Sequence, residues 1–440
     1  MISSRNTYLA DMITAQKRGQ AQGIYANCSA NQFVIEAGVK QALQDGSGLL
    51  VESTSNQVDQ FGGYIRMTPI QFTQYVKDIA ASMGMPPERI IIGGDHLGPN
   101  VWQNEPTASA MAKARVLVQE CILAGYNKIH LDASMKCGDD APDVPLEKII
   151  IAERTAELCL AAEQAYLQVQ ASLPKPVYVI GSEVPLPGGA HAKESRVAVT
   201  KVEDTEETIA ITKNAFIKRG LEAAWERVIA LVVQPGVEFG DDFVHEYNSI
   251  QASGLSRFIE AHEHLVFEAH STDYQRREAL RKMVADHFAI LKVGPALTFA
   301  FREAVFALAL MEREWLVDKS GVSLSNIIDI LDSVMRANPI HWKKHYIGTE
   351  EYLRYARRYS YSDRARYYWS MPELQQALRI LLANLEKNPV PLMLLSQFMP
   401  VQYERLREGS LGLSPRDLIH DKIASVLADY AYACGMGGAG

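Results

Sequence analysis

Eight short apolar runs, rich in valine and isoleucine, recur through the first three hundred residues of the chain. Each is followed by a polar or Gly/Pro loop and then by a longer segment of helical spacing. The runs span residues 23–26, 49–52, 90–93, 128–132, 177–180, 229–233, 265–268 and 289–293. Eight is the number of parallel strands at which a helix-covered sheet closes into a barrel filled by its own side chains. The sequence therefore predicts an α/β fold, a TIM-type (β/α)8 barrel.

The predicted barrel runs from about residue 20 to about 315 and forms a first domain, 1–315. Strand patterns then stop, and helical spacing such as that of Leu374, Leu378 and Leu381 predicts an α-helical extension packed on the barrel, 316–440. A doubly wound open sheet is the alternative, because periodicity does not reveal strand order. Segment 185–203, which follows a predicted strand, is predicted to be a long loop, and this loop is expected to act as a lid.

Composition excludes several classes of protein. A net charge of −8 opposes nucleic-acid binding, which depends on a surplus of Lys and Arg. The 5 cysteines form no C-x-x-C pair, which indicates a reducing cytoplasm. No apolar run is long enough to span a membrane. The G-x-G-x-x-G match at 435–440 lies at the chain end, where no helix follows it to hold a dinucleotide.

Polar residues follow almost every apolar run, where a barrel assembles its active site. They are Glu52, Asp95, His96, Asp132, Glu183, Gln234, Glu268, His270 and Lys292. Nearly all are ionisable, and buried charge is costly unless it is paired or bound to a metal. We therefore expect a functional site at this end of the barrel.

Two imidazoles and a carboxylate, from His96, Glu183 and His270, are the residue types of a catalytic zinc site with an open position. Manganese and nickel suit the same ligands. The alternative to a metal site is a metal-free hydrogen-bond network. Within a metal site, Glu52 or Glu268 could be the carboxylate ligand in place of Glu183. We predict catalytic roles for four residues in all, Asp95, Asp132, Glu268 and Lys292, with Asp95 beside His96 as a proton carrier.

Lys292 admits other interpretations, namely a Schiff base with a sugar carbonyl, an ion pair with Glu268, or contact with an anionic substrate group. His130 shares a strand face with Asp132 and is interpreted as a buried layer residue. Segment 341–369 interleaves Arg with Tyr and Trp, which favours either a packed helical surface or an anion clamp through Arg364 or Arg366. The predicted substrate-contacting residues are Glu52, Asn56, Gln234, Ser271, Asp273, Arg364 and Arg366.

The motifs at the strand ends together resemble the GatZ/KbaZ family over nearly the whole chain. They lie at residues 51–64, 94–100, 128–135, 181–185, 234–239, 268–275 and 291–298. The resemblance implies a partner subunit of D-tagatose-1,6-bisphosphate aldolase, described as non-catalytic and as stabilising a class II aldolase chain in galactitol breakdown. Some relatives are metal-dependent ketohexose 4-epimerases, and an older name is tagatose-6-phosphate kinase. The sequence contains no phosphate loop or kinase signature.

The polar strand ends favour an active site over a purely supporting role. Catalytic class II aldolase chains carry a Gly-rich phosphate loop late in the barrel, and here the matching stretch is 292–295, so phosphate binding there is in doubt. The C4 proton of a 2-ketohexose is not acidified by the C2 carbonyl, so inversion at C4 requires cleavage and re-formation of the C3–C4 bond. We expect a metal-dependent protein acting on a ketohexose or its phosphate, alone as a homo-oligomer or beside an aldolase chain.

Overall fold

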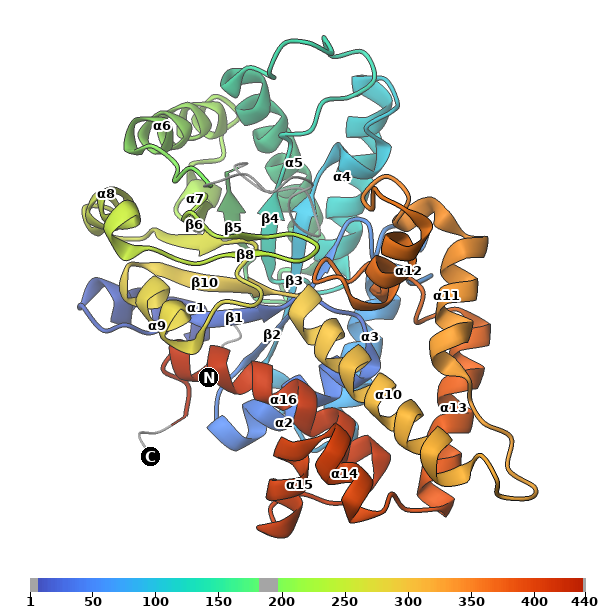
Figure 1. Ribbon diagram of the computed structural model, residues 1–440. Coiled ribbons are helices and arrows are strands. Elements are labelled where there is room, and N and C mark those ends of the chain that lie inside the picture. Colours follow the sequence, from blue (N-terminus) through green and yellow to red (C-terminus); the bar gives the residue numbers. More distant parts are fainter. Residues whose placement is uncertain (1–6, 182–196, 438–440) are drawn as a thin grey trace.

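The computed structural model describes residues 7–181 and 197–437. Its centre is a closed parallel barrel with the strand order β1-β10-β9-β6-β5-β4-β3-β2 (Figure 1). The strands are β1 (Ile24–Asn27), β2 (Leu49–Thr54), β3 (Ile90–Leu97), β4 (Lys128–Leu131), β5 (Val177–Ile180), β6 (Val228–Val232), β9 (Val266–Ala269) and β10 (Phe288–Val293). The predicted barrel is confirmed. The doubly wound alternative is wrong, because the first and last strands pair, with Ile24 opposite Ile290.

Helices cover the outside of the barrel, as parallel strands require. They are α2 (Gln32–Asp45), α3 (Pro69–Ser82), α4 (Thr107–Leu123), α5 (Lys148–Val169), α6 (Val202–Lys218), α7 (Glu222–Trp225), α8 (Ser249–Glu260), α9 (Arg277–Ala285) and α10 (Pro295–Leu316). Helix α1 (Thr7–Lys17) precedes the first strand, and its Leu9 and Met12 join the apolar cluster formed by the barrel interior. This helix therefore closes the amino-terminal end of the barrel.

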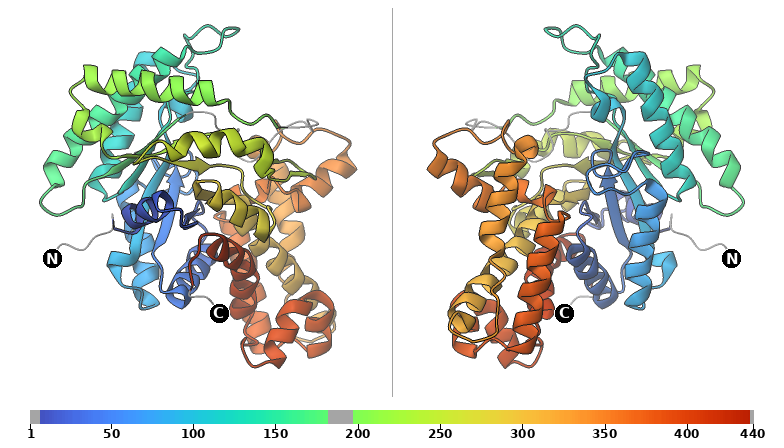
Figure 2. Two further views of the ribbon diagram at one scale, coloured as in Figure 1. Left: turned by 90° about the vertical axis from the view of Figure 1, so that its left-hand side faces the viewer. Right: turned by 90° about the vertical axis from the view of Figure 1, so that its right-hand side faces the viewer.

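The remaining helices gather on one side of the barrel (Figure 2). They are α11 (Ile327–Ala337), α12 (Glu350–Tyr359), α13 (Pro372–Lys387), α14 (Leu392–Phe398), α15 (Pro400–Arg407) and α16 (Pro415–Ala433). Helix α16 packs against α2, α9 and α10, and the N–H of Gly23 donates to the carbonyl of Cys434 at 2.9 Å. The end of the chain is thus attached to the start of the first strand.

Two features differ from, or add to, the predicted organisation. An antiparallel hairpin, β7 (Glu238–Phe239) with β8 (Val244–His245), follows β6 and was not predicted, because two-residue strands are too short to show a period. Most of the predicted lid, 185–203, lies outside the described residues, and α6 begins at its end. Within the described ranges, no helix has the length and apolar character needed to cross a bilayer.

Candidate active site

The inward-facing positions of the strands change from apolar to charged along the barrel. Residues two apart share a strand face. On β2, Leu50 is followed by Glu52, and on β9, Val266 is followed by Glu268. Leu50 and Val266 belong to the apolar interior cluster, whereas both glutamates are fully buried one layer above it. The polar strand ends noted in the sequence are therefore one continuous charged layer above an apolar plug.

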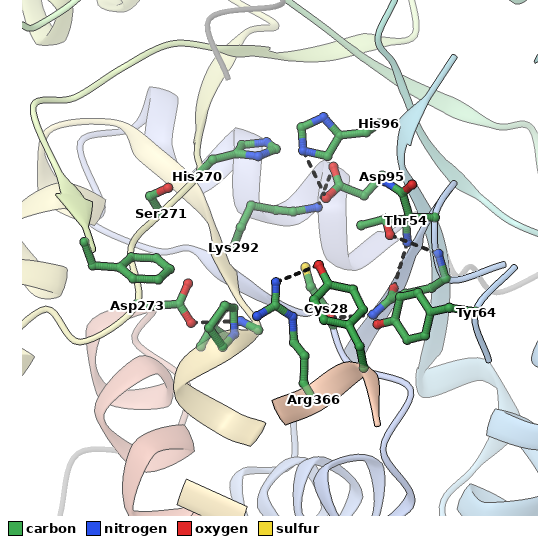
Figure 3. A pocket seen from close by; sticks show the side chains of 17 residues that line it. Cys28, Thr54, Tyr64, Asp95, His96, His270, Ser271, Asp273, Lys292 and Arg366 are labelled. Carbon is green, nitrogen blue, oxygen red and sulfur yellow. Dashed lines mark hydrogen bonds and ion pairs between the residues drawn. The ribbon is translucent and has the colours of Figure 1, made fainter. Parts of the chain in front are cut away.

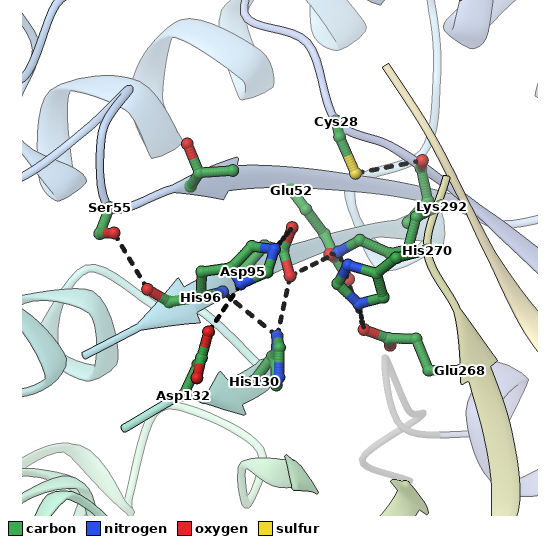
Figure 4. Close-up of polar contacts among 12 residues, drawn as sticks. Cys28, Glu52, Ser55, Asp95, His96, His130, Asp132, Glu268, His270 and Lys292 are labelled. Carbon is green, nitrogen blue, oxygen red and sulfur yellow. Dashed lines mark hydrogen bonds and ion pairs between the residues drawn. The ribbon is translucent and has the colours of Figure 1, made fainter. Parts of the chain in front are cut away.

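Two lysines pair with the buried glutamates of this layer, and one of them, Lys292, lies beside Glu52 and Asp95 in Figure 4. Lys128 Nζ lies 2.7 Å from Glu52 Oε1 and 2.5 Å from Glu268 Oε2, and all three side chains are fully buried. Lys292 contacts the other oxygen of Glu52, lies 3.0 Å from Asp95 Oδ1 and is 3.9 Å from Glu268. Such pairing is what makes buried charges tolerable.

The next layer is an array of imidazoles and aspartates around Asp95. His130 Nδ1 lies 2.9 Å from Asp95 Oδ1, and His96 Nδ1 lies 2.8 Å from Asp132 Oδ2. His270 Nε2 lies 3.0 Å from Glu268 Oε1, which links this layer to the one below. Each imidazole thus has a carboxylate partner that fixes its ring, as metal-binding and acid–base histidines require.

Backbone irregularities direct consecutive residues to the same place. The pairing of β3 with β4 shifts between Gly94 and Leu97, and His96 between them has a φ of 49°. Ser271, directly after His270, has a φ of 52°. Bulges and left-handed non-glycine residues concentrate at functional sites, where packing holds them in place. Because of this bulge, Asp95 and His96 are both brought to the pocket.

Opposing charges set the ionisation of the site. Burial alone would raise the pKa of Asp95, but the charges of His96 and His270 and the bond to His130 hold it well below its usual range. Against the opposing effect of burial, Asp95 and Asp132 raise the pKa of His96 to about 9. Burial lowers the pKa of Lys292 to about 8 and also lowers that of His270. Asp95 therefore stays ionised and Lys292 remains mostly protonated at neutral pH.

A pocket with a volume of about 110 Å³ opens directly above this array (Figure 3). Eight predicted site residues line it, namely Asn56, Asp95, His96, His270, Ser271, Asp273, Lys292 and Arg366. Glu52, Asp132 and Glu268 lie behind these side chains and contact them. The strand-end residues are therefore brought together around one cavity.

Two further predicted residues, Gln234 and Arg364, are also not among those that line the pocket. The side-chain oxygen of Gln234 accepts hydrogen bonds from the N–H groups of Gly236 and Val237, so it closes a turn. Arg364 is buried with its guanidinium 2.9 Å from His345 Nδ1. Glu183 lies outside the described residues.

The described residues fit a divalent cation. One possible ligand atom from each of Asp95, His130, Glu268 and His270 lies within 4.8 Å of the others. The ring centroid of His96 lies 5.0 Å from that of His270 and 5.1 Å from that of His130, and the centroids of His130 and His270 are 5.4 Å apart. Tetrahedral zinc with Zn–N bonds of about 2.0–2.1 Å separates ring centroids by about 5 Å.

Charge balance points the same way. Among the described residues, these layers hold four buried carboxylates, from Glu52, Asp95, Asp132 and Glu268, and two ammonium groups, those of Lys128 and Lys292. The difference, four minus two, leaves two negative charges for a divalent cation or for protonated imidazoles to balance. The raised pKa of His96 is a response to the same excess of negative charge.

The motifs and this geometry agree with a comparison to known families. Residues 9–435 match the model of the D-tagatose-1,6-bisphosphate aldolase subunit GatZ/KbaZ-like family. The chain belongs to the GatZ/KbaZ-like family. A solved relative from Sinorhizobium meliloti 1021, named a probable tagatose 6-phosphate kinase, is 41% identical with a TM-score of 0.85. The match covers 94% of this chain and 100% of the relative.

More distant similarities are to aldolases. The YdjI aldolase from Escherichia coli K12 is 11% identical, with a TM-score of 0.42 over 73% of this chain and 89% of its own. A fructose-bisphosphate aldolase from Campylobacter jejuni is 13% identical, with a TM-score of 0.41 over 86% of this chain and 92% of its own. These values are too low to support any statement about the GatZ/KbaZ-like chain.

Several residues of this GatZ/KbaZ-like site are not predicted by the sequence pattern. Lys128 stands at the first position of β4, where a lysine usually marks a solvated strand end, yet its spacing of two from His130 places both on the inward face. Cys28, Tyr64, Phe239 and Tyr367 line the pocket from loops and very short elements that no periodic pattern marks. His130 is buried, as predicted, and contacts Asp95.

Proposed function

We propose that this chain catalyses metal-dependent cleavage of the C3–C4 bond of a ketohexose or its phosphate. The outcome is either 4-epimerisation between fructose and tagatose or aldol cleavage of tagatose-1,6-bisphosphate. The observation that carries the proposal is the convergence of His96, His270 and Asp95 on one pocket above a paired, buried charge layer. A chain that only braces another subunit has no need of this costly arrangement.

The proposed cation ligands are His96 and His270 with a carboxylate. Glu183 is the carboxylate predicted from the sequence, and Glu268 and Asp95 are the described carboxylates beside the two histidines. A divalent cation there supplies Lewis-acid stabilisation of negative charge on the substrate oxygens at C2 and C3. Zinc fits the ligand types, and manganese and nickel are the alternatives.

Asp95 is proposed as the proton carrier. It lines the pocket, and Lys292 and His130 fix its Oδ1. Asp95 takes the proton of the C4 hydroxyl as the C3–C4 bond breaks. The electron pair of that bond passes to C3, where it is conjugated with the C2 carbonyl. C4 becomes an aldehyde. If the aldehyde turns and re-adds, the proton returns to the oxygen and C4 is inverted. If the aldehyde leaves, C3 takes up a proton and the sugar is cleaved.

Asp132 and Lys292 have supporting roles in this proposal. Asp132 lies behind His96 and orients its ring through Nδ1. Lys292 pairs with Glu52 and Asp95, which favours an ammonium over a Schiff base. Borohydride treatment in the presence of fructose should leave Lys292 unmodified, as mass spectrometry of the peptide would show.

The decisive experiment uses the chain purified alone. Its metal content is measured, and fructose, tagatose and their phosphates are followed by NMR with and without a chelator. Turnover that is lost with the chelator and restored by metal supports the proposal. His270→Ala should lose both metal and turnover, whereas His262→Ala, beyond the end of α8, should keep both. Turnover by a metal-free chain would contradict it.

A second candidate function is a non-catalytic subunit that stabilises a separate class II aldolase chain. The description of the matched family as an aldolase subunit favours it. It predicts no turnover by the chain alone and turnover only when an aldolase chain is added, with both chains eluting together in size-exclusion chromatography.

A further inference from the structure

The amino-terminal end of α10 is the part of the pocket where barrel enzymes commonly bind a substrate phosphate. That helix follows the eighth barrel strand and is 22 residues long. Free N–H groups and the helix dipole make such an end attractive to anions. Gly294 and Pro295, at the start of this helix, line the pocket beside Lys292. A phosphorylated sugar would be expected to place its phosphate here.

In this chain a carboxylate of the protein already occupies that position. Asp273 Oδ1 accepts hydrogen bonds from the N–H of Gly294 at 3.0 Å and from the N–H of Ala296 at 2.8 Å. Pro295 has no N–H, and the N–H groups of Leu297 and Thr298 donate to the carbonyl of Gly294. Every N–H of the first turn is therefore accounted for within the protein.

The loop that carries Asp273 is held firmly against β10 and α16. Thr272 Oγ1 donates to the carbonyl of Lys292 at 2.6 Å, and the hydroxyl of Tyr430 donates to the carbonyl of Thr272 at 2.8 Å. Tyr274 has a φ of 64° and donates its hydroxyl to the carbonyl of Tyr361. Asp273 is 3% exposed and nevertheless lines the pocket, so its carboxylate is fixed in place beside the cavity.

A second carboxylate and the nearest guanidinium complete the surroundings. Asp363 Oδ2 accepts a hydrogen bond from Thr298 Oγ1 at 2.5 Å, so another acidic group meets the first turn of α10. Arg366 lines the pocket but donates to the carbonyls of Ser362 and Asp363 and to the hydroxyl of Tyr367. A phosphate here would face the carboxylate of Asp273, with that of Asp363 buried next to the same helix turn.

We propose that Asp273 is a specificity-determining residue that takes the place of a substrate phosphate at α10 and selects a ketohexose with a free hydroxyl there. This inference rests on the proposed function, whose substrate class it narrows. A sugar hydroxyl donates to the carboxylate, whereas a phosphate in the same position is repelled by it. The 1,6-bisphosphate, with an anion at both ends of the sugar, is therefore excluded.

The test separates anion binding from turnover. Inorganic phosphate is titrated by calorimetry into the wild type, Asp273→Ser, Asp273→Asn and the control Asp140→Asn. The control neutralises a carboxylate that pairs with Arg154 and does not line the pocket. We expect Asp273→Ser to bind phosphate at least about tenfold more tightly than the wild type and the control.

Kinetics give the second measurement. They use Asp273→Asn, which removes the charge but keeps the shape of the side chain and therefore remains informative if Asp273→Ser fails to fold. For the wild type, KM for the bisphosphate should exceed KM for the free sugar by at least about tenfold. Asp273→Asn should reduce that ratio by a similar factor, and the control Asp140→Asn should leave it unchanged. The inference would be overturned if the wild type had equal KM values for the bisphosphate and the free sugar. It would also be overturned if Asp273→Ser folded but bound phosphate no more tightly than the wild type. A different outcome is that Asp273→Ser binds phosphate more tightly than the wild type while the wild type turns over no sugar. That result would uphold the role of Asp273 and overturn the proposed function.

Discussion

Lys128 shows how far a single residue can depart from its usual environment. The side chain is fully buried and contacts two glutamates, yet a lysine at a strand start normally extends into water. The sequence predicted Glu52 and Glu268 at the site because they end apolar runs, but their shared partner could not be predicted. Only barrel closure brings the side chain of Lys128, on β4, between Glu52 of β2 and Glu268 of β9.

Replacing Lys128 should test how much the buried charge layer depends on it. Lys128→Met removes the buried ammonium that Glu52 and Glu268 share, so the free energy of unfolding should fall by about 3–5 kcal/mol in a urea titration. Lys113→Met, which removes a half-exposed pair with Glu105, should cost less than about 1 kcal/mol. Similar losses in the two variants would contradict the assignment.

Asp132 tests the orientation of His96. Asp132→Asn keeps the shape of the side chain but weakens its interaction with His96 Nδ1, so metal affinity should fall about 10–100-fold in a competition with a chelator. Asp140→Asn, which breaks a pair with Arg154 elsewhere in the fold, is the matched control and should leave metal affinity unchanged. Unaltered affinity in Asp132→Asn would remove His96 from the ligand set.

At the scale of elements, β3 is the strand that most shapes the site. Its glycines leave room for neighbours, since a Cβ on Gly93 would lie 2.8 Å from Glu52 Cγ. Its bulge then turns Asp95 and His96 to the pocket. The strand itself was predicted from its isoleucines, whereas the bulge was not, because extra residues in a ladder are defined only relative to the partner strand.

A methyl group at Gly93 should disturb the charge layer. Gly93→Ala pushes Glu52 away from Lys128 and Lys292, so the free energy of unfolding should fall by about 1–3 kcal/mol and metal retention should decrease. Gly254→Ala, within α8, is the control, because its Cβ would lie at an ordinary contact distance of 3.5 Å from the side chain of Val202 on α6. That variant should be up to about 1 kcal/mol more stable in the same thermal or urea unfolding experiment.

At the scale of the whole molecule, the barrel and its extension form a connected structure. Helix α16 contacts α2, α9 and α10, and Tyr430 on it supports the loop that carries Asp273. Residues more than 150 positions apart thereby determine one pocket wall. The sequence predicted that the extension is helical and packs on the barrel, but its contact with the site depends on the packing of whole helices.

Stability should depend on pH through Glu238. Burial raises its pKa from 4.5 to about 7 in the folded chain. Between these values the folded state keeps a proton that the unfolded state has lost, so this stabilisation is complete below pH 4.5 and disappears as pH rises through 7. The unfolding free energy of the wild type relative to Glu238→Gln should fall by roughly 3 kcal/mol from about pH 4 to about pH 8. A difference that stays flat across this range would contradict the burial of the charge.

The sequence by itself determined the barrel, its helical extension, the family and the strand-end residues around the pocket. It could do so because strand period, helix period and residue type are local properties that barrel closure converts into position. Only the tertiary structure decided that Lys128 pairs with Glu52 and Glu268, that Gln234 closes a turn, and that Asp273 occupies the start of α10. Those outcomes depend on which distant strands and loops meet, and a hydrogen bond or ion pair exists only once both partners are in place.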